Sequence, residues 1–164
     1  MTLTPELVIS TARTMMGTKY VHGGRHPKLG LDCTGLPAAT ATMIDYPFVD
    51  VTNYSPIPDG QLLDHLRRNG DEVPVTRMPR RERRTGLIPV DDLRPSDLVA
   101  FWLDHTSRVA QHVAILTHYP GGLFDLGMIH VYSHVEKVVE HALDREWRYR
   151  MLAAFRWRGM TWPG

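Results

Sequence analysis

The sequence has little cysteine, little net charge and no long apolar run, and each shortage excludes a class of protein. A single cysteine in 164 residues cannot form an intramolecular disulfide, so the fold needs no oxidising compartment. A net charge of +1 gives no strong attraction to nucleic acid. The longest apolar run, Leu98 to Leu103, is far shorter than the ~20 residues of a membrane-spanning helix. We therefore expect no nucleic-acid partner and no membrane span.

The remaining gross features are those of a globular domain. Hydrophobic residues make up 43% of the chain and charged residues 23%, and no internal repeat is visible. The N-terminus has no basic opening followed by an apolar core, so we expect no secretory signal. We expect residues 1–164 to form one domain.

Helical patterns come first along the chain and strand patterns later. Apolar residues at helical spacing and capping residues predict three helices, at residues 4–17, 33–44 and 59–70. Short β-rich runs separated by turn signals predict strands at residues 97–103, 112–118, 128–134, 137–143 and 151–159, with one helical turn at 144–150. Helices followed by an antiparallel meander predict an α+β fold.

The only cysteine, Cys33, lies in "GLDCTGL" and has two interpretations. It is either a small buried apolar residue or a nucleophile at the start of a helix. Asp32 can cap the helix through its side chain, which would leave Cys33 in the first turn beside unpaired backbone N–H groups. The positive end of the helix dipole and a nearby imidazolium would lower the pKa of the thiol, and the N–H groups could stabilise an oxyanion.

Two of the nine histidines lie on strands where they could serve such a thiol. His112 begins the run "HVAILT", and His130 lies in "MIHVY". If these strands pair antiparallel, the two side chains share one face and can be neighbours. One imidazole would then take the thiol proton while the other fixes its tautomer. His134 is the rival to His130, and three further histidines are interpreted as surface residues: His105, His118 and His141.

Four separated motifs together resemble the NlpC/P60 cysteine peptidases: "GTKYVHGG", "LDCTGL", "QHVAIL" and "MIHV". The resemblance covers about Leu3 to Arg158. It implies a papain-like α+β fold in which the cysteine helix packs on a small antiparallel sheet. It also implies an enzyme without a cofactor that cleaves peptidoglycan stem peptides through a thioester.

The resemblance assigns a role to each matching residue. Cys33 would be the nucleophile, His112 the general base and His130 the residue that orients it. Tyr20 would contribute its hydroxyl to the oxyanion site. Three more residues would contact the substrate: Asp32, Thr34 and His22. His22 stands where many members carry an aromatic or another polar residue.

The short form of the chain, and its "VVEHAL…WRYRMLAAFRWRG" end, resemble versions carried in phage tails and gene-transfer particles. We therefore expect synthesis in the bacterial cytoplasm, delivery to the wall on a particle, and contact with particle proteins. Two alternatives stay open. The fold could serve as a non-enzymatic scaffold in tail assembly, or the same cysteine and histidine could perform acyl transfer or amidase chemistry.

Other features have less specific interpretations. His22, His26, Cys33 and His112 could suggest zinc, but no second cysteine or metal-binding spacing supports a site, so we expect no metal. The arginine-rich loop from Arg77 to Arg84 is either a solvated loop or a contact for anionic wall polymer or an assembly partner.

Two further positions, besides His22, depart from the pattern of the family. Pro37 should delay or distort the start of the cysteine helix, because it lacks an N–H and its ring crowds the preceding turn. Ser96 replaces a glycine that usually precedes the aspartate of "PSDLVAF". We expect this second departure to alter only a turn.

Overall fold

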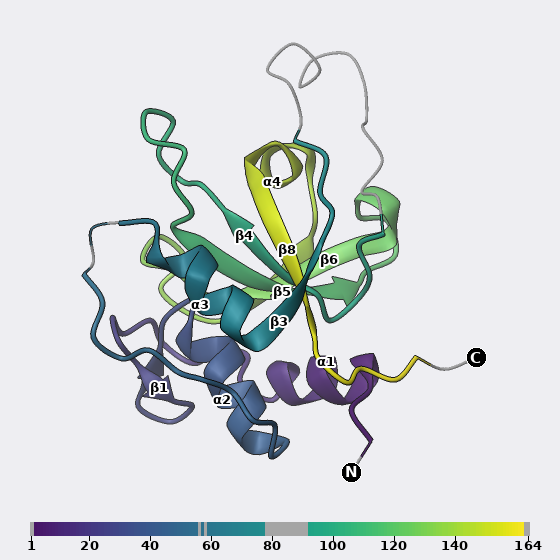
Figure 1. The fold of residues 1–164 in the computed structure, drawn as a ribbon. Helices are drawn as coiled ribbons and strands as arrows, with labels where there is room; N and C mark the ends of the chain where they lie inside the picture. Colours follow the sequence, from purple (N-terminus) through teal and green to yellow (C-terminus); the bar gives the residue numbers. More distant parts are fainter. Residues whose placement is uncertain (1, 56, 58, 78–91, 163–164) are drawn as a thin grey trace.

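A computed structural model describes residues 2–55, 57, 59–77 and 92–162 (Figure 1). Its helices are α1 (Pro5–Arg13), α2 (Gly35–Met43), α3 (Gln61–Asn69), the 3₁₀ turn η1 (Leu123–Asp125) and α4 (Arg145–Arg150). Its strands are β1 (Arg25–His26), β2 (Gly30–Leu31), β3 (Gly70–Val73), β4 (Leu98–Phe101), β5 (His112–His118), β6 (Leu126–His130), β7 (Val139–Ala142) and β8 (Met151–Trp157). The expected helices and strands are all present: β5 has its predicted bounds, β6 lies earlier than predicted, at 126–130 instead of 128–134, and the others are shorter than predicted. None of these helices is both long enough and apolar enough to span a bilayer.

Six strands form one antiparallel sheet in the order β3-β8-β4-β5-β6-β7. Strands β4 to β7 are the predicted meander, and each pairs with the next along the chain. The last strand, β8, does not lie at an edge but between β3 and β4. Strand β3 was not predicted, since its sequence, "GDEV", is too short and polar to show an alternating pattern.

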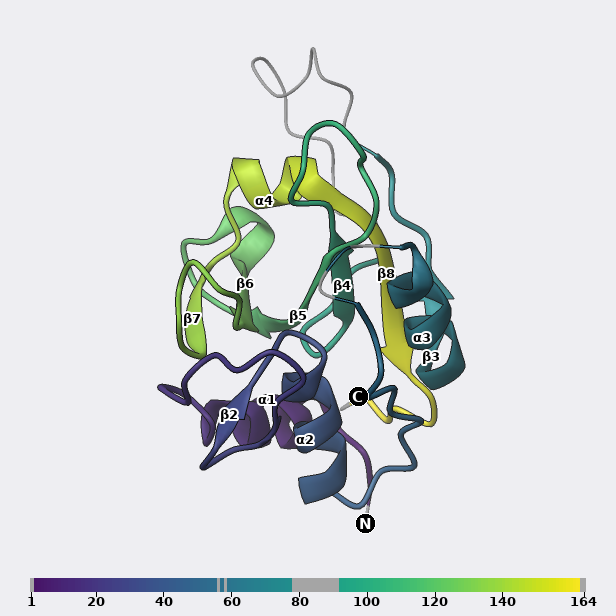
Figure 2. The same cartoon turned by 90° about the vertical axis from the view of Figure 1, so that its left-hand side faces the viewer.

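Helices cover the two faces of this sheet unequally (Figure 2). Helices α1 and α2 pack together on one face, where Val113 and Ile115 of β5 join their apolar side chains in one cluster. The alternate residues Ala114 and Leu116 face the other side, in a second cluster with Trp147 of α4. Alternate side chains of β5 therefore point into two different apolar layers, one on each face of the sheet, and all its residues but the last are buried.

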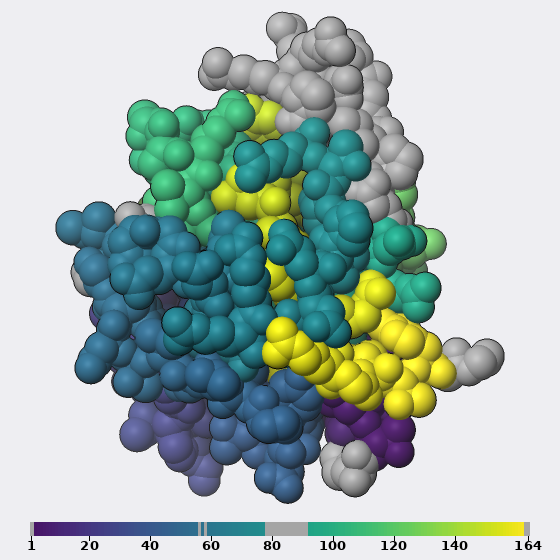
Figure 3. All heavy atoms as spheres, viewed as in Figure 1, coloured from purple at the N-terminus to yellow at the C-terminus, as the bar shows by residue number. Residues whose placement is uncertain are grey.

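Helix α3 and the segment that leads into it lie over β8 on the face shown in Figure 3. Their spheres, coloured blue to teal, leave β8 (yellow) visible only in part. Tyr46 and Phe48 of this segment contact the ring of Trp157 at the end of β8, with centroids 5.1 and 6.0 Å apart. The segment between α2 and α3 is thereby attached to the end of β8, next to the edge strand β3.

Ser96 has a backbone φ of 79°, in the left-handed region that glycine adopts without strain. Its backbone is held there on both sides: its N–H donates to Leu116, and its carbonyl accepts from the indole N–H of Trp157. This positive φ explains why a glycine is usual at this position in the family. The serine keeps the same turn at the cost of about 1 kcal/mol of strain.

The arginine-rich stretch from Arg77 to Arg84 lies, after its first residue, outside the described part of the chain. Whether it contacts wall polymer or a partner stays a prediction.

Candidate active site

Cys33 precedes α2, because the helix begins two residues later than predicted, at Gly35. Asp32 caps it as expected: its Oδ1 accepts a hydrogen bond of 2.8 Å from the N–H of Gly35. Pro37 explains why α2 begins late, as expected from the sequence. Proline has no N–H to donate to the carbonyl of Cys33, four residues earlier, so the helical ladder cannot include that carbonyl.

Gly35 is required because the glycine-rich loop passes directly over it. A Cβ at this position would lie 1.9 Å from the carbonyl oxygen of Gly24, which is backbone and cannot move aside. This contact explains the glycine of the Asp-Cys-Thr-Gly motif. It also fixes the loop of residues 21–30 against the start of the cysteine helix.

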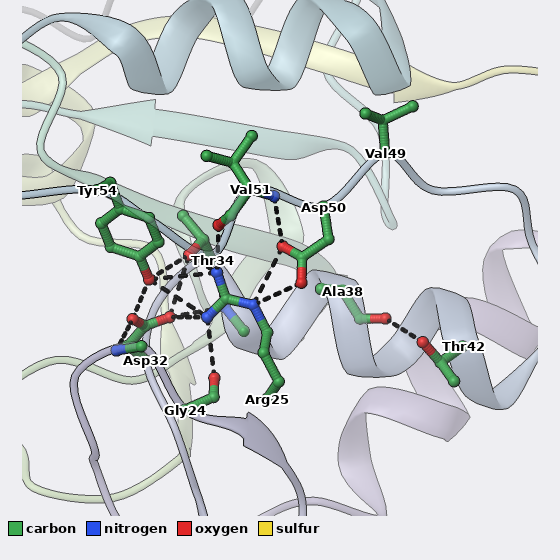
Figure 4. A network of polar contacts seen from close by, with 12 residues as sticks. Gly24, Arg25, Asp32, Thr34, Ala38, Thr42, Val49, Asp50, Val51 and Tyr54 are labelled. Atoms are coloured by element: carbon green, nitrogen blue, oxygen red, sulfur yellow. Dashed lines mark hydrogen bonds and ion pairs between the residues drawn. The ribbon is translucent and has the colours of Figure 1, made fainter.

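A buried polar network holds Asp32 in place beside the cysteine (Figure 4). The guanidinium of Arg25 lies between two carboxylates, at 2.9 Å from Asp32 and 2.8 Å from Asp50. Tyr54 donates its hydroxyl hydrogen to Asp32, and the hydroxyls of Tyr54 and Thr34 lie 2.8 Å apart. The polar groups of Asp32 and Thr34 are thus already engaged within the protein. Their predicted contact with substrate stays a prediction.

His112 and His130 meet as the strand pattern predicted. In the register of β5 and β6, Leu116 opposes Met128 and Ile115 opposes Ile129, which places His112 diagonally across from His130 on the same face. Their rings are joined through His112 Nε2 and His130 Nδ1, 2.8 Å apart. The rival residue His134 is exposed and contacts only the ring of Tyr132 among the described residues.

The interpretation of His141 as a surface residue is wrong. Its Nε2 lies 2.8 Å from Nε2 of His130, and its Nδ1 lies 2.8 Å from the carbonyl oxygen of Ala142. The register of β6 and β7 causes this, since it sets His141 opposite Met128 and diagonal to His130. The register of this hairpin was not available from the sequence, so the third histidine was missed.

The predicted residues surround one cavity of about 510 Å³. Six of the seven predicted site residues line it: Tyr20, His22, Asp32, Cys33, Thr34 and His112. The seventh, His130, is fully buried, and its bond to His112 shows that it stands behind that residue. The sulfur of Cys33 lies 4.0 Å from the carbonyl oxygen of Gln111, the residue directly before His112. The structure thus brings the cysteine to the start of β5.

Tyr20 and His22 occupy the loop side of this cavity. Tyr20 is fixed by its backbone N–H, which donates to Glu136, while its hydroxyl has no hydrogen-bond partner among the described residues. Burial, with the nearby Asp32 and Cys33, raises the pKa of Tyr20, so its hydroxyl keeps its proton and can donate it in a hydrogen bond. His22 is exposed and contacts the ring of Tyr54 edge-on.

Three other residues of the site were not predicted. Arg25 and Tyr54 hold Asp32, and His65 of α3 lines the cavity. His65 is buried, and neither ring nitrogen has a partner within the described residues. Arg25 alone had a weak signal, as the arginine in the glycine-rich loop. Tyr54 and His65 lie far along the chain in segments with no motif.

Burial keeps both reacting groups of the site neutral. It raises the pKa of the Cys33 thiol to about 12, with a further contribution from the Asp32 carboxylate, against hydrogen bonds from the backbone of Val113 and Thr34. It lowers the pKa of His112 to about 3. The prediction that the thiol pKa is lowered is therefore wrong for the resting protein. Both groups are therefore in their neutral forms near pH 7.

The rate of alkylation of Cys33 by iodoacetamide should consequently rise with pH up to at least pH 10 without a plateau. Only the thiolate reacts, and a raised thiol pKa shrinks the thiolate fraction at every pH below it. Reaction should also be slower than that of glutathione at pH 8. Stopped-flow or mass-spectrometric rates between pH 5 and pH 10 provide the measurement. A plateau between pH 5 and pH 8 would reveal a preformed thiolate–imidazolium pair and contradict the expectation.

Among the described residues, no group of three or more histidine, cysteine, aspartate or glutamate side chains is arranged to hold a metal ion. His26 lies in β1 and does not line the cavity that contains Cys33 and His112.

No family model matches the sequence, and no curated protein matches it. Solved structures with the same fold include the NlpC/P60 domain of the peptidoglycan hydrolase SagA, which is 21% identical with a TM-score of 0.57. That match covers 94% of this chain and 99% of the other. NlpC2 from Trichomonas vaginalis is 18% identical with a TM-score of 0.63, over 93% of this chain and 46% of the other.

The peptidoglycan hydrolase RipB from Mycobacterium tuberculosis is also similar, at 18% identity and a TM-score of 0.56. That match covers 93% of this chain and 63% of the other. The chain therefore has the α+β, papain-like fold of NlpC/P60 domains, which confirms the predicted fold class.

Proposed function

We propose that this protein is a cysteine endopeptidase that cleaves amide bonds in the stem peptides of peptidoglycan. One observation carries the proposal: Cys33 and His112 line the same cavity, and His112 is bonded to a buried histidine that can orient it. Two of the similar structures, those of SagA and RipB, are of peptidoglycan hydrolases. This supports the substrate class.

The chemistry follows from the groups around the cavity. The Cys33 proton passes to His112 as the sulfur attacks the amide carbon, and the tetrahedral oxyanion accepts a hydrogen bond from the Tyr20 hydroxyl. The imidazolium of His112 then protonates the leaving amine, and a thioester forms. Water, losing its proton to His112, attacks the thioester and releases the carboxylate, which restores the thiol.

Digestion of purified muropeptides tests this proposal. The wild-type protein should release fragments that carry one new amine and one new carboxylate, which mass spectrometry identifies together with the bond that is cut. Protein pretreated with iodoacetamide at high pH is the control and should release none. An intact, folded protein that leaves every muropeptide uncut would favour the scaffold role. Products joined to an added amine, instead of water, would favour acyl transfer.

Delivery on a phage tail or gene-transfer particle is a separate part of the proposal. It is supported by the resemblance of residues 138–159 to that branch of the family. Mass spectrometry of purified particles from the producing cells tests it.

A further inference from the structure

Three histidines from three neighbouring strands form a continuous line of hydrogen bonds beneath the proposed active site. His112 of β5 joins His130 of β6, and His130 joins His141 of β7, each through ring nitrogens 2.8 Å apart. The line ends at the carbonyl oxygen of Ala142, 2.8 Å from Nδ1 of His141. Each strand contributes one residue because successive registers set the rings on a diagonal across the sheet.

The carbonyl at the end of this line determines where every proton lies. A carbonyl oxygen can only accept, so Nδ1 of His141 must carry a hydrogen. In a neutral ring its Nε2 is then an acceptor, and Nε2 of His130 must donate to it. Nδ1 of His130 is left as an acceptor, so Nε2 of His112 donates to it. Among the ring nitrogens of these three histidines, only Nδ1 of His112 carries no hydrogen and accepts no hydrogen bond from the others.

The surroundings of His112 and His130 favour the neutral rings that this order requires. The indole of Trp147 contacts all three imidazoles, at centroid distances of 5.6 Å from His112, 5.1 Å from His130 and 6.3 Å from His141. His112 and His130 are almost completely buried. Burial lowers the pKa of His130 to about 2, as it lowers that of His112, so both stay neutral near pH 7.

We propose that His141 is a positioning residue that fixes, through His130, the tautomer in which Nδ1 of His112 is free to take the proton of Cys33. The kinetic part of this inference rests on the proposed peptidase function. The tautomers themselves do not, since they exist without substrate. With His141 absent, His130 could instead donate from Nδ1 to Nε2 of His112. That ring would then carry its hydrogen on Nδ1 and could not act as a base.

Nuclear magnetic resonance of ¹⁵N-histidine-labelled protein at pH 8 tests the tautomers directly. In the wild type, His112 and His130 should carry hydrogen on Nε2 and His141 on Nδ1. His141→Phe keeps an aromatic ring against Trp147 but removes the acceptor, so the single tautomer of His130 should be lost. His141→Gln, whose amide oxygen can accept from His130, should restore it. A wild-type protein with hydrogen on Nδ1 of His130 would overturn the proposal, whatever the variants do.

Kinetics on muropeptides supply the second readout. His141→Phe should lower kcat by about 10- to 100-fold with KM within twofold, less than the loss from removing a general base outright. His141→Gln should recover most of that loss. His118→Phe, an exposed histidine on β5, is the matched control and should change neither constant. Equal kcat values for the wild type and His141→Phe would contradict a positioning role. An inactive wild type would refute the proposed function, while the resonances would still decide the tautomers.

Discussion

Replacing Cys33 with alanine is expected to abolish muropeptide cleavage, and replacing it with serine to lower kcat/KM by at least about 10⁴-fold. Cys33 is the only cysteine in the sequence, so no other thiol can take its place as the nucleophile. Serine keeps the shape of the side chain but has a far less acidic proton. Its proton is therefore harder for His112 to remove, and oxygen is a weaker nucleophile than sulfur toward the amide carbon.

Initial rates measured by chromatography of the released fragments provide the comparison. Met43→Ala is the control, because Met43 lies at the far end of the same helix and its side chain is exposed. It should leave the rate unchanged. Thermal unfolding of each variant shows that the loss is not one of folding. If Cys33→Ala kept a tenth of the wild-type rate, the thioester route would be excluded.

Replacing Asp32 with alanine is expected to lower the free energy of unfolding by about 3–5 kcal/mol. The carboxylate accepts hydrogen bonds from five groups: the backbone N–H of Gly23 and Gly35, and the side chains of Arg25, Thr34 and Tyr54. Alanine would leave a half-buried guanidinium with only Asp50 as a charged partner. It would also leave the buried N–H of Gly35 without its acceptor.

Urea denaturation at pH 7 measures this effect. Asp32→Asn keeps the size of the side chain but replaces one acceptor oxygen with a donor, so it should recover only part of the stability. The control is Asp64→Ala, which removes a carboxylate from an exposed ion pair with Arg67 on α3. That change should cost less than about 1 kcal/mol. Equal stabilities for Asp32→Ala and Asp64→Ala would mean that the network around Arg25 does not hold the loop.

The parts of the site that were predictable share one property: they follow from local sequence. The alternation in "HVAILTH" and "MIHVY" predicted that His112 and His130 share a face of the sheet. The position of Asp32 directly before the helix predicted that its side chain caps it. Pro37 gave the late start of α2 in the same way. Each of these depends on residues within one turn or one strand of the feature itself.

What the sequence did not indicate depends on contacts between distant segments. His141 joins His130 only through the register of the β6–β7 pair. Tyr54 reaches Asp32 from a segment without regular structure. The raised pKa of Cys33 comes from burial, which is a property of the finished fold. Local pattern therefore located Cys33, His112 and His130 but not the environment that sets their protonation.

The place of β8 has a consequence for when the protein can fold during its synthesis. This strand, residues 151–157, pairs with β3 on one side and β4 on the other. A nascent chain on the ribosome cannot join those two halves until β8 has emerged. The cavity beside Cys33 should therefore take its final form only after residues 151–157 have been synthesised and have left the ribosome.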